Sequence, residues 1–529
     1  MTDSQHLTDS AQTRVKELCP TDGIRKKGIL IEDGNPARYR LETTIDHIDE
    51  SESHRKIIFG ERDTKKPHKT FLIVGETGTG KTTLINTMIN YTCGVQREDK
   101  IWIEITDDQS DRTSAHSQTS IITVYGVYIP ESSVDLTIID TPGYGDTRGT
   151  GHDKEIGRSL QHVGTSDDVA YGTSAVCFVI KADQNRLTDR QQYIFDAVQC
   201  LFGKDIEENI VLLFTHSTGA RPKNALTAVK EAKIKCAVDE KKQPIYFLFN
   251  NCQSEAFDEE DQTMQDHLWD LSYKGMTGLF KFLDTVRPKT LQMTKDVLQK
   301  RKQLEANISN LQSRVQEIEI KHTELKQTEE ALEKQNQYFQ DNKNFEFTVE
   351  VPYKEMVDID PAVAGKAMCC TVCEENCHYP DCWWVKSLSW CTVMKGGYCT
   401  VCTKKCHYSK HKKEAKIYVT KTKPETKSSE DLKIQYTQKM GENTSLMDHL
   451  KTEIHSLDKK KEKLVTEAYS CVETLEMIAL KSDSLFILQH IDFLIEKLNE
   501  MEDTNKAAFL MDIKKRAGEE RKKKESTYQ

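Results

Sequence analysis

The chain has 529 residues, of which 37% are hydrophobic and 30% are charged, and its net charge of −10 argues against a protein that binds nucleic acid along its length. Because that length exceeds the usual size of one hydrophobic core, two or three structural units are expected. The sequence has no secretory signal, no prenylation motif and no apolar stretch of about 18 residues, so we expect a cytoplasmic protein without a transmembrane segment.

Residues 1–65 are polar and are expected to be partly disordered, except for a flanking strand at residues 57–59. Residues 66–287 contain short apolar runs that alternate with helical segments. This alternation predicts an α/β fold in which helices cover both faces of a mainly parallel sheet. The expected strands are residues 71–74, 101–105, 121–129, 136–139, 175–180, 210–214 and 245–249.

A complete phosphate-loop pattern, G-x-x-x-x-G-K-[ST], follows the first apolar run of this domain. The pattern predicts a P-loop NTPase, because its glycines let backbone N–H groups face a phosphate at the start of a helix. Lys81 is expected to reach the β- and γ-phosphates, and the Thr82 hydroxyl to bind Mg²⁺. The nucleotide-binding candidates are Gly75, Glu76, Thr77, Gly78, Thr79, Gly80, Lys81, Thr82 and Thr83.

A second motif, Asp140-Thr-Pro-Gly143, lies at the end of the expected strand 136–139. An acidic residue at the carboxyl end of a strand beside the phosphate loop holds Mg²⁺ through water. The N–H of Gly143 is expected to donate to the γ-phosphate, which makes residues 144–149 a candidate switch segment.

Leucine and isoleucine recur every seven residues in two later segments, residues 288–345 and 421–529, which predicts α-helical coiled coil. Two alternatives remain: an antiparallel hairpin within one chain, or pairing with a partner chain. The segment between the two helices is expected to form the tip of such a hairpin. The tail, residues 514–524, is basic, which favours a solvated helix end or contact with an anionic membrane surface.

Nine of the sixteen cysteines lie between residues 369 and 406, inside the segment 346–420. Two copies of the pattern C-T-V-C-x₃-C-H-Y are separated by 29 residues, and the last position of the repeat is Cys in one copy and His in the other. Since Cys and His are interchangeable as zinc ligands, the pattern predicts two structural Zn²⁺ sites, one per repeat. The expected ligands are Cys370, Cys373, Cys377 and Cys382 in one site, and Cys399, Cys402, Cys406 and His411 in the other.

His378 and His407 are competing ligands, and sharing of ligands in one interleaved site is the alternative. The insert is expected either to recognise a partner or to order the hairpin tip.

The phosphate loop, the motif at 140–147 and the segment 202–215 resemble the immunity-associated (GIMAP/AIG-type) GTPases and their septin relatives over about residues 66–285. That resemblance implies GTP/GDP and Mg²⁺ binding, slow hydrolysis, and a G-domain homodimer or higher oligomer. It also implies that a switch threonine binds Mg²⁺, for which Thr119 is the first choice and Thr113 and Thr123 are alternatives.

The base-recognition motif departs from the family pattern N/T-K-x-D, because Thr215-His-Ser-Thr218 ends in threonine where the aspartate is expected. Thr215, His216 and Asn250 are the resulting candidates for base contact. Tyr144 stands where Ras-like enzymes have a water-positioning glutamine, and Arg148 is a catalytic candidate.

We therefore expect a GTP-dependent switch or assembly protein, with an unknown protein partner bound through the coil or the insert. The alternatives are a scaffold with a structural, non-hydrolysing nucleotide site and an ATP-using P-loop enzyme.

Overall fold

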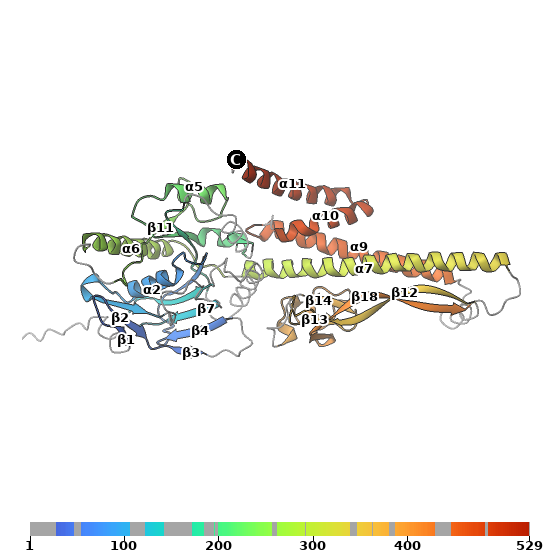
Figure 1. Cartoon of the computed structure of the whole chain (residues 1–529), viewed down its shortest axis with the longest axis horizontal. Helices are drawn as coiled ribbons and strands as arrows, with labels where there is room; N and C mark the ends of the chain where they lie inside the picture. The colour runs from blue at the N-terminus through green and yellow to red at the C-terminus, as the bar shows by residue number, and fades with distance from the viewer. Residues whose placement is uncertain are drawn as a thin grey trace, which may run out of the picture. The chain divides into compact units, whose positions relative to one another are not determined.

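The computed structural model describes residues 28–46, 54–105, 122–141, 172–184, 195, 199–200, 202–255, 262–290, 292–338, 346–361, 363–379, 387–428, 446–481 and 485–527. The chain forms two compact units. The first comprises residues 1–195 and 207–290, and the second comprises residues 196–206 and 291–529. Figure 1 labels their elements.

An eight-stranded sheet forms the centre of the first unit, with the order β11-β10-β9-β5-β8-β7-β4-β3. The strands from β11 to β8 are parallel, β7 is antiparallel to β8, β4 is parallel to β7, and β3 is antiparallel to β4. The predicted mainly parallel α/β fold is therefore confirmed. The strand bounds are β3 (Thr44–Asp46), β4 (His54–Phe59), β5 (His68–Gly75), β7 (Ile122–Val127), β8 (Asp135–Asp140), β9 (Ala175–Lys181), β10 (Ile210–Thr215) and β11 (Tyr246–Leu248).

The central strand β5 is buried on both faces, as its uninterrupted apolar sequence predicts. Phe71, Ile73 and Val74 are fully buried. The core that contains Phe71 and Ile73 also holds apolar residues of α2 and α6. The loop between β5 and α2 thus starts from a fixed strand and enters a packed helix. The described helices of this unit are α2 (Lys81–Thr92), α5 (Lys223–Glu231) and α6 (Gln262–Leu283), together with the 3₁₀ turn η1 (Arg97–Asp99). A further turn, η3 (Lys204–Asn209), begins in the second unit.

Within the amino-terminal region, the described residues 28–46 include strands that the sequence analysis does not predict. Strands β1 (Gly28–Glu32) and β2 (Ala37–Leu41) form a separate three-stranded sheet with β6 (Ile101–Glu104), so the expected strand 101–105 does not join the main sheet. The Arg38 guanidinium donates to the Glu104 carboxylate at 2.8 Å between β2 and β6. This largely buried ion pair is a contact between distant residues, which local composition does not reveal.

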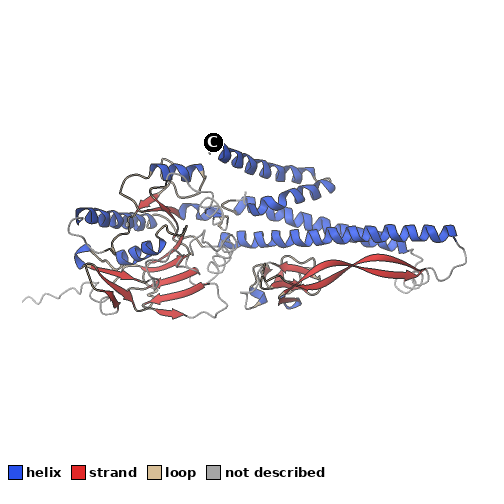
Figure 2. Cartoon of the chain, in the orientation of Figure 1, coloured by secondary structure: helices blue, strands red, loops and turns tan. Residues whose placement is uncertain are grey.

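Two long antiparallel helices, α7 (Gln292–Tyr338) and α9 (Leu446–Ile478), form the axis of the second unit (Figure 2). Asn307 lies beside Cys471, and Lys321 pairs with Glu453 at 3.0 Å, so residue numbers rise along α7 as they fall along α9. The heptad segments therefore pair within one chain. Helices α10 (Leu485–Glu500) and α11 (Thr504–Thr527) pack their apolar residues into the same core.

The heptad pattern of α7 describes its packing only as far as Ile318. Farther along the helix, Glu324 and Thr328 are 1% and 0% exposed. Lys321 pairs with the Glu324 carboxylate at 2.9 Å, and Lys427 from a strand that covers α7 pairs with it as well. Beyond Ile318, the buried side of α7 therefore includes ion-paired polar residues as well as apolar ones.

That strand belongs to a two-stranded ribbon of β12 (Glu346–Asp358) and β18 (Lys416–Ser428), which are paired along their whole lengths. The ribbon carries the cysteine-rich module, residues 359–415. Ala306 of α7 lies in the core of that module, and the Asn310 amide donates to the Asn376 carbonyl at 3.3 Å. The expected place of the cysteines at the hairpin tip is therefore corrected, because the ribbon brings them beside the first half of α7.

The described part of the module contains short elements. They are β13 (Ala367–Cys370), β14 (Glu375–His378), β15 (Met394–Lys395), β16 (Tyr398–Cys399), β17 (His411–Glu414) and the 3₁₀ turns η4 (Leu388–Trp390) and η5 (Tyr408–Lys410). Among the helices that the structure describes, none combines the length and apolar character needed to cross a bilayer.

Candidate functional site

The loop between β5 and α2, residues 76–80, has a backbone that its glycines make possible. Gly78 and Gly80 both have φ of +79°, in the left-handed region that favours glycine. At Gly75, a Cβ atom would lie 2.7 Å from the Val179 carbonyl oxygen, so a side chain there would displace the loop from β9. Three of the predicted loop residues are thus glycine for identifiable steric reasons.

Two threonine hydroxyls fix the shape of this loop. The Thr79 hydroxyl donates to the Glu76 carbonyl at 2.8 Å. The Thr215 hydroxyl, at the end of β10, donates to the Thr79 carbonyl at 2.7 Å, and Thr215 is 1% exposed. The candidate base-contact residue Thr215 therefore positions the loop through its backbone.

Lys81 lies beneath the loop and is 7% exposed. Its ammonium group donates to the carbonyls of Gly75 at 3.0 Å and Glu76 at 3.2 Å. Burial lowers the pKa of Lys81, while the nearby charges of Asp140 and Glu76 oppose that shift. A buried cation held by two neutral carbonyls is suited to an anionic ligand, because further negative charge would offset its desolvation.

Asp140 ends β8, the strand next to β5, and its register partner there is Ile73. Asp140 is 1% exposed, so its carboxylate acts on Lys81 in a region of low dielectric. Thr82 and Thr83 follow Lys81 in the first turn of α2 and are partly buried. The structure thus brings Lys81, Thr82 and Asp140, three of the predicted phosphate and Mg²⁺ residues, to the carboxyl edge of the sheet.

Several predicted residues lie outside the described part of the chain, namely Gly143, Tyr144, Arg148, Thr113 and Thr119. The remaining switch candidate, Thr123, lies within β7 opposite Asp140. It is fully buried, and its hydroxyl accepts a hydrogen bond from Arg55 Nε at 3.1 Å. Thr123 is therefore part of the sheet rather than of a switch loop.

The expected base-contact segment lies beside the phosphate loop. A Cβ atom on Gly80 would be 3.6 Å from His216 Cε1. The Asn250 amide donates to the Ser217 carbonyl at 3.0 Å, which joins the segments after β10 and β11. Thr218 is exposed there. Partial desolvation, followed by the charge of Lys181, lowers the pKa of His216, which favours a neutral imidazole.

Sequence reasoning missed Ser272, a fully buried residue of α6. Its hydroxyl accepts hydrogen bonds from the backbone N–H groups of Asn250 at 3.1 Å and Asn251 at 3.3 Å. Ser272 therefore fixes the loop that carries Asn250. A single serine within a helical pattern carries no local signal for such a contact.

The cysteine-rich module groups its potential ligands differently from the sequence expectation. Cys370 and Cys373 lie with Cys402 and Cys406 of the second repeat. Cys377 lies with Cys399, Cys402 and His411. In each group the potential ligand atoms are all within 4.8 Å of one another. One site per repeat is therefore corrected to two groups that each combine both repeats, and Cys382 lies outside the described residues.

The competing histidines are absent from both groups. His378 Nδ1 lies 3.0 Å from Cys391 Sγ, and His407 Nδ1 lies 3.0 Å from the Ser409 hydroxyl. No disulfide joins any of the cysteines that the structure describes.

Residues 69–271 match the model of the AIG1 family, which confirms the resemblance over that domain. The chain is 33% identical over 117 residues to Septation protein 7 of Candida albicans, a match that covers 17% of this chain and 18% of that protein. It is 26% identical over 150 residues to Immune-associated nucleotide-binding protein 10 of Arabidopsis thaliana, which covers 28% of each. The chain thus spans less than a third of the length of these curated relatives.

Among solved structures, Toc33 from Arabidopsis thaliana in complex with GDP and Mg²⁺ aligns with 42% of this chain and 87% of its own, at 15% identity and a TM-score of 0.30. The complex of Toc33 with Mg²⁺ and GMPPNP aligns with the same 42% of this chain and 88% of its own, at 15% identity and a TM-score of 0.30.

Replacing Thr215 by valine should destabilise the first unit, because the nearly isosteric change leaves the buried Thr79 carbonyl without its donor. We expect the free energy of unfolding to fall by about 1–3 kcal/mol. Thr227→Val is the matched control, since the Thr227 hydroxyl bonds only to the Lys223 carbonyl on an exposed helix face, and it should change stability by less than about 0.5 kcal/mol. Urea unfolding monitored by circular dichroism measures both, and equal stability of the two variants would contradict this role of Thr215.

Proposed function

Since residues 69–271 form an AIG1-type domain, we propose that the chain binds a guanine nucleoside triphosphate and Mg²⁺ at the loop between β5 and α2. The observation that carries the proposal is Lys81, a buried ammonium group held at the loop by two carbonyls. A β- or γ-phosphate would replace these weak partners with charged ones. The left-handed backbone at Gly78 and Gly80 gives the loop a tight turn, of the kind that directs backbone N–H groups at a phosphate.

Thr82 and Asp140 are the proposed Mg²⁺ residues. Thr82 lies in the first turn of α2, directly after Lys81, and can offer its hydroxyl. Asp140 supplies a carboxylate at the end of β8. Mg²⁺ keeps several water ligands and takes oxygen donors. When bound, the ion neutralises charge on the phosphates. The Asp140 carboxylate is suited to hold the water ligands of Mg²⁺, because its charge acts on Lys81 and it therefore lies near the proposed phosphate position.

Base selection is proposed to involve Thr215, His216 and Asn250, with weaker discrimination than in proteins that have the motif aspartate. Thr218 is exposed beside the loop but offers no carboxylate for a guanine N1–H and amino group. Asn250, held by Ser217 and Ser272, lies in the corresponding final loop and supplies an amide. A site that lacks one polar partner discriminates poorly between similar bases.

Slow hydrolysis and nucleotide-dependent self-association are proposed as the output, with immune defence as the setting suggested by the family. The sequence has Tyr144 where a water-positioning glutamine stands in related enzymes. A second G domain or a partner protein would therefore supply the missing group, because positioning and charge stabilisation carry phosphoryl transfer. Free thiols favour the cytoplasm, with membrane contact through the basic tail as an accessory interaction.

Two other functions would use the same loop differently. A scaffold protein would retain its nucleotide without turnover. Thr218 in place of the motif aspartate and Tyr144 in place of the glutamine favour this function. An ATP-using enzyme is favoured only by the missing aspartate. Base competition and turnover measurements separate the three functions.

Zinc binding by the cysteine-rich module is part of the same proposal. Eight of the described cysteines lie between residues 369 and 406, in a module built from short strands and turns. Structural zinc contributes its binding free energy to folding in such modules. Zinc there would stabilise the surface that recruits a protein partner. Elemental analysis of the purified chain tests this, since a metal-free folded module would exclude it.

Lys81→Ala should weaken binding of a GTP analogue by about 100-fold or more, because it removes a charged donor from the phosphates. Thr82→Ala should weaken Mg²⁺-dependent binding in the same assay. Lys69→Ala is the control, since Lys69 lies in β5, the strand that leads into the loop, but pairs with Asp284 at 2.9 Å. The affinity of this variant should stay within about twofold. Isothermal titration calorimetry decides, and retained affinity in Lys81→Ala would contradict the proposed site.

Thr218→Asp should sharpen base selection by adding the missing acceptor at an exposed position. We expect the ratio of GTP to ATP affinity to rise about tenfold, which corresponds to about 1.4 kcal/mol. Competition against a fluorescent GTP analogue measures it. Thr218→Asn, which is similar in size but uncharged, is the control. Equal competition by ATP and GTP in the unmodified chain would favour the ATP-using enzyme.

Turnover per molecule should be slow in dilute protein and should rise with protein concentration, because association would supply the catalytic group. Phosphate release measured over a wide concentration range tests this. Rapid turnover that is independent of concentration would contradict the need for association, and no turnover at any concentration would favour the scaffold.

A further inference from the structure

Cys402 belongs to both groups of potential metal ligands in the cysteine-rich module. From this arrangement we propose that the module holds one binuclear zinc cluster, in which the thiolate of Cys402 bridges the two ions. The inference rests on the proposed zinc binding and specifies its form. One ion would take four cysteines, and the other would take three cysteines and a histidine.

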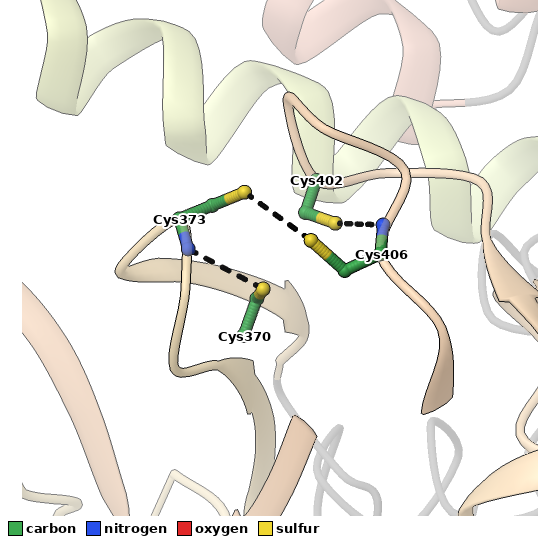
Figure 3. A group of neighbouring side chains, drawn as sticks. All are labelled: Cys370, Cys373, Cys402 and Cys406. Carbon is green, nitrogen blue, oxygen red and sulfur yellow. Dashed lines mark hydrogen bonds between the residues drawn. The ribbon is translucent and has the colours of Figure 1, made fainter. Parts of the chain in front are cut away.

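In the all-cysteine group, one sulfur–sulfur distance between the two repeats matches that of a zinc site. Figure 3 shows Cys370 and Cys373 facing Cys402 and Cys406 from the opposite repeat. The sulfur atoms of Cys373 and Cys406 are 3.8 Å apart. An edge of a tetrahedron with metal–sulfur bonds of about 2.3 Å has a length of about 3.8 Å. The first group therefore already has the spacing that zinc requires between ligands from different repeats.

The mixed group is marked by the orientation of His411. This side chain is 4% exposed, and its Nδ1 atom lies 3.1 Å from the His407 carbonyl oxygen, to which it can donate. Its Nε2 atom is buried and makes no hydrogen bond. A histidine ligand commonly donates one ring N–H to a carbonyl, which fixes the ring and leaves the other nitrogen for the metal. His411 has this arrangement beside the thiols of Cys377, Cys399 and Cys402.

The number of ligands favours a bridge over two independent sites. Two tetrahedral zinc ions need eight coordination positions, whereas the two groups contain seven side chains because they share Cys402. A thiolate sulfur has enough lone pairs to bind two ions. Cys402 is fully buried, and its sulfur accepts a hydrogen bond from the Cys406 N–H at 3.2 Å. It occupies the position that a bridging ligand requires.

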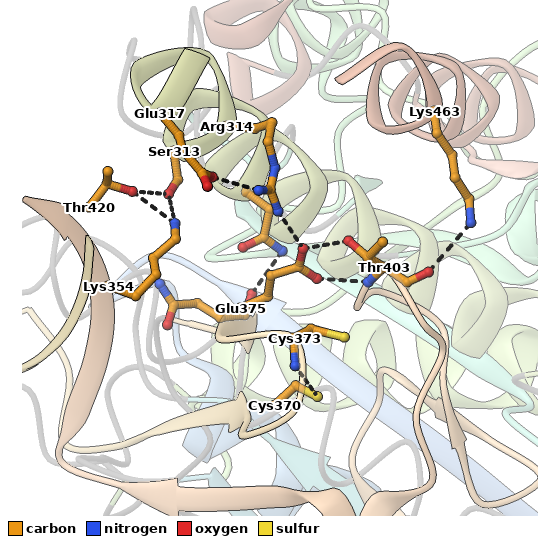
Figure 4. Close-up of polar contacts among 12 residues, drawn as sticks. Ser313, Arg314, Glu317, Lys354, Cys370, Cys373, Glu375, Thr403, Thr420 and Lys463 are labelled. Atoms are coloured by element: carbon orange, nitrogen blue, oxygen red, sulfur yellow. Dashed lines mark hydrogen bonds and ion pairs between the residues drawn. The ribbon is translucent and has the colours of Figure 1, made fainter. Parts of the chain in front are cut away.

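A buried glutamate aligns the two repeats around this bridge (Figure 4). Glu375 lies between Cys373 and Cys377, is 4% exposed, and accepts hydrogen bonds from the backbone N–H of Thr403 at 2.7 Å and from its hydroxyl. Arg314 of α7 donates to the same carboxylate at 3.3 Å. Because Thr403 directly follows Cys402, Glu375 is a positioning residue that fixes the bridging cysteine against the first repeat and the long helix.

The full-length chain loaded with ¹¹³Cd²⁺ in place of zinc tests the bridge without mutation. The expected NMR spectrum has two cadmium resonances, with the four-sulfur site less shielded than the three-sulfur, one-nitrogen site. Each should be split by the other through the shared sulfur. Two unsplit resonances, or a single resonance, would overturn the bridge.

Zinc content after dialysis against a competing chelator tests the same proposal independently. The unmodified chain should retain two ions, and Cys373→Ser and Cys377→Ser should each retain one. Cys402→Ser should retain none, because it removes a ligand from both ions. Cys369→Ser is the matched control and should retain two, since Cys369 is equally buried but its sulfur bonds to Asn376 and lies outside both groups.

A Cys402→Ser chain that retains one ion would contradict the bridge. One ion in the unmodified chain would overturn the binuclear cluster while leaving zinc binding intact, and no metal in the unmodified chain would exclude zinc itself. If Cys402→Ser does not fold, the cadmium spectrum of the unmodified chain still decides.

Discussion

The Lys81 ammonium group lies beneath the loop between β5 and α2, where 7% of the residue is exposed and its partners are two backbone carbonyls. A buried cation is costly unless negative charge compensates it. Asp140, at the end of the neighbouring strand β8, supplies part of that negative charge. The glycines allow the tight turn of the loop, and the Thr215 hydroxyl holds the Thr79 carbonyl in place. The first unit is thus organised to receive an anion, and the proposed nucleotide follows from this electrostatic requirement.

The second unit meets a different constraint, because the described part of its cysteine-rich module consists of short strands and turns that must form a core. Cys370, Cys377 and Cys402 are fully buried in it. The ribbon of β12 and β18 brings the module beside α7, where Ala306 and Arg314 contact it. Arg314 and Glu375 then connect the long helix to the loop after Cys402. The proposed metal ligation would therefore support the same small structure as this helix packing.

Much of the first site could be predicted because its signal is local: a strand, the loop pattern and a helix occupy consecutive positions, and the parallel sheet places Asp140 beside them. Contacts between distant residues could not be predicted. Ser272 positions Asn250, which is distant in the sequence. Arg38 and Glu104 form an ion pair between β2 and β6 in a second sheet. Glu324 is buried on α7 where the heptad pattern ends. Likewise, the similarity of the two cysteine repeats indicated zinc ligands, but it carried no information about which repeat each thiol faces.

The central claim is that the loop holds a guanine nucleotide through Lys81 and Mg²⁺. The most direct test is to incubate the purified full-length chain with equal amounts of GTP, ATP and excess Mg²⁺, desalt it, and identify the retained nucleotide by chromatography. We expect guanine nucleotide to be retained and to be released when Mg²⁺ is chelated. Retention of mainly adenine nucleotide, or of no nucleotide at all, would contradict it.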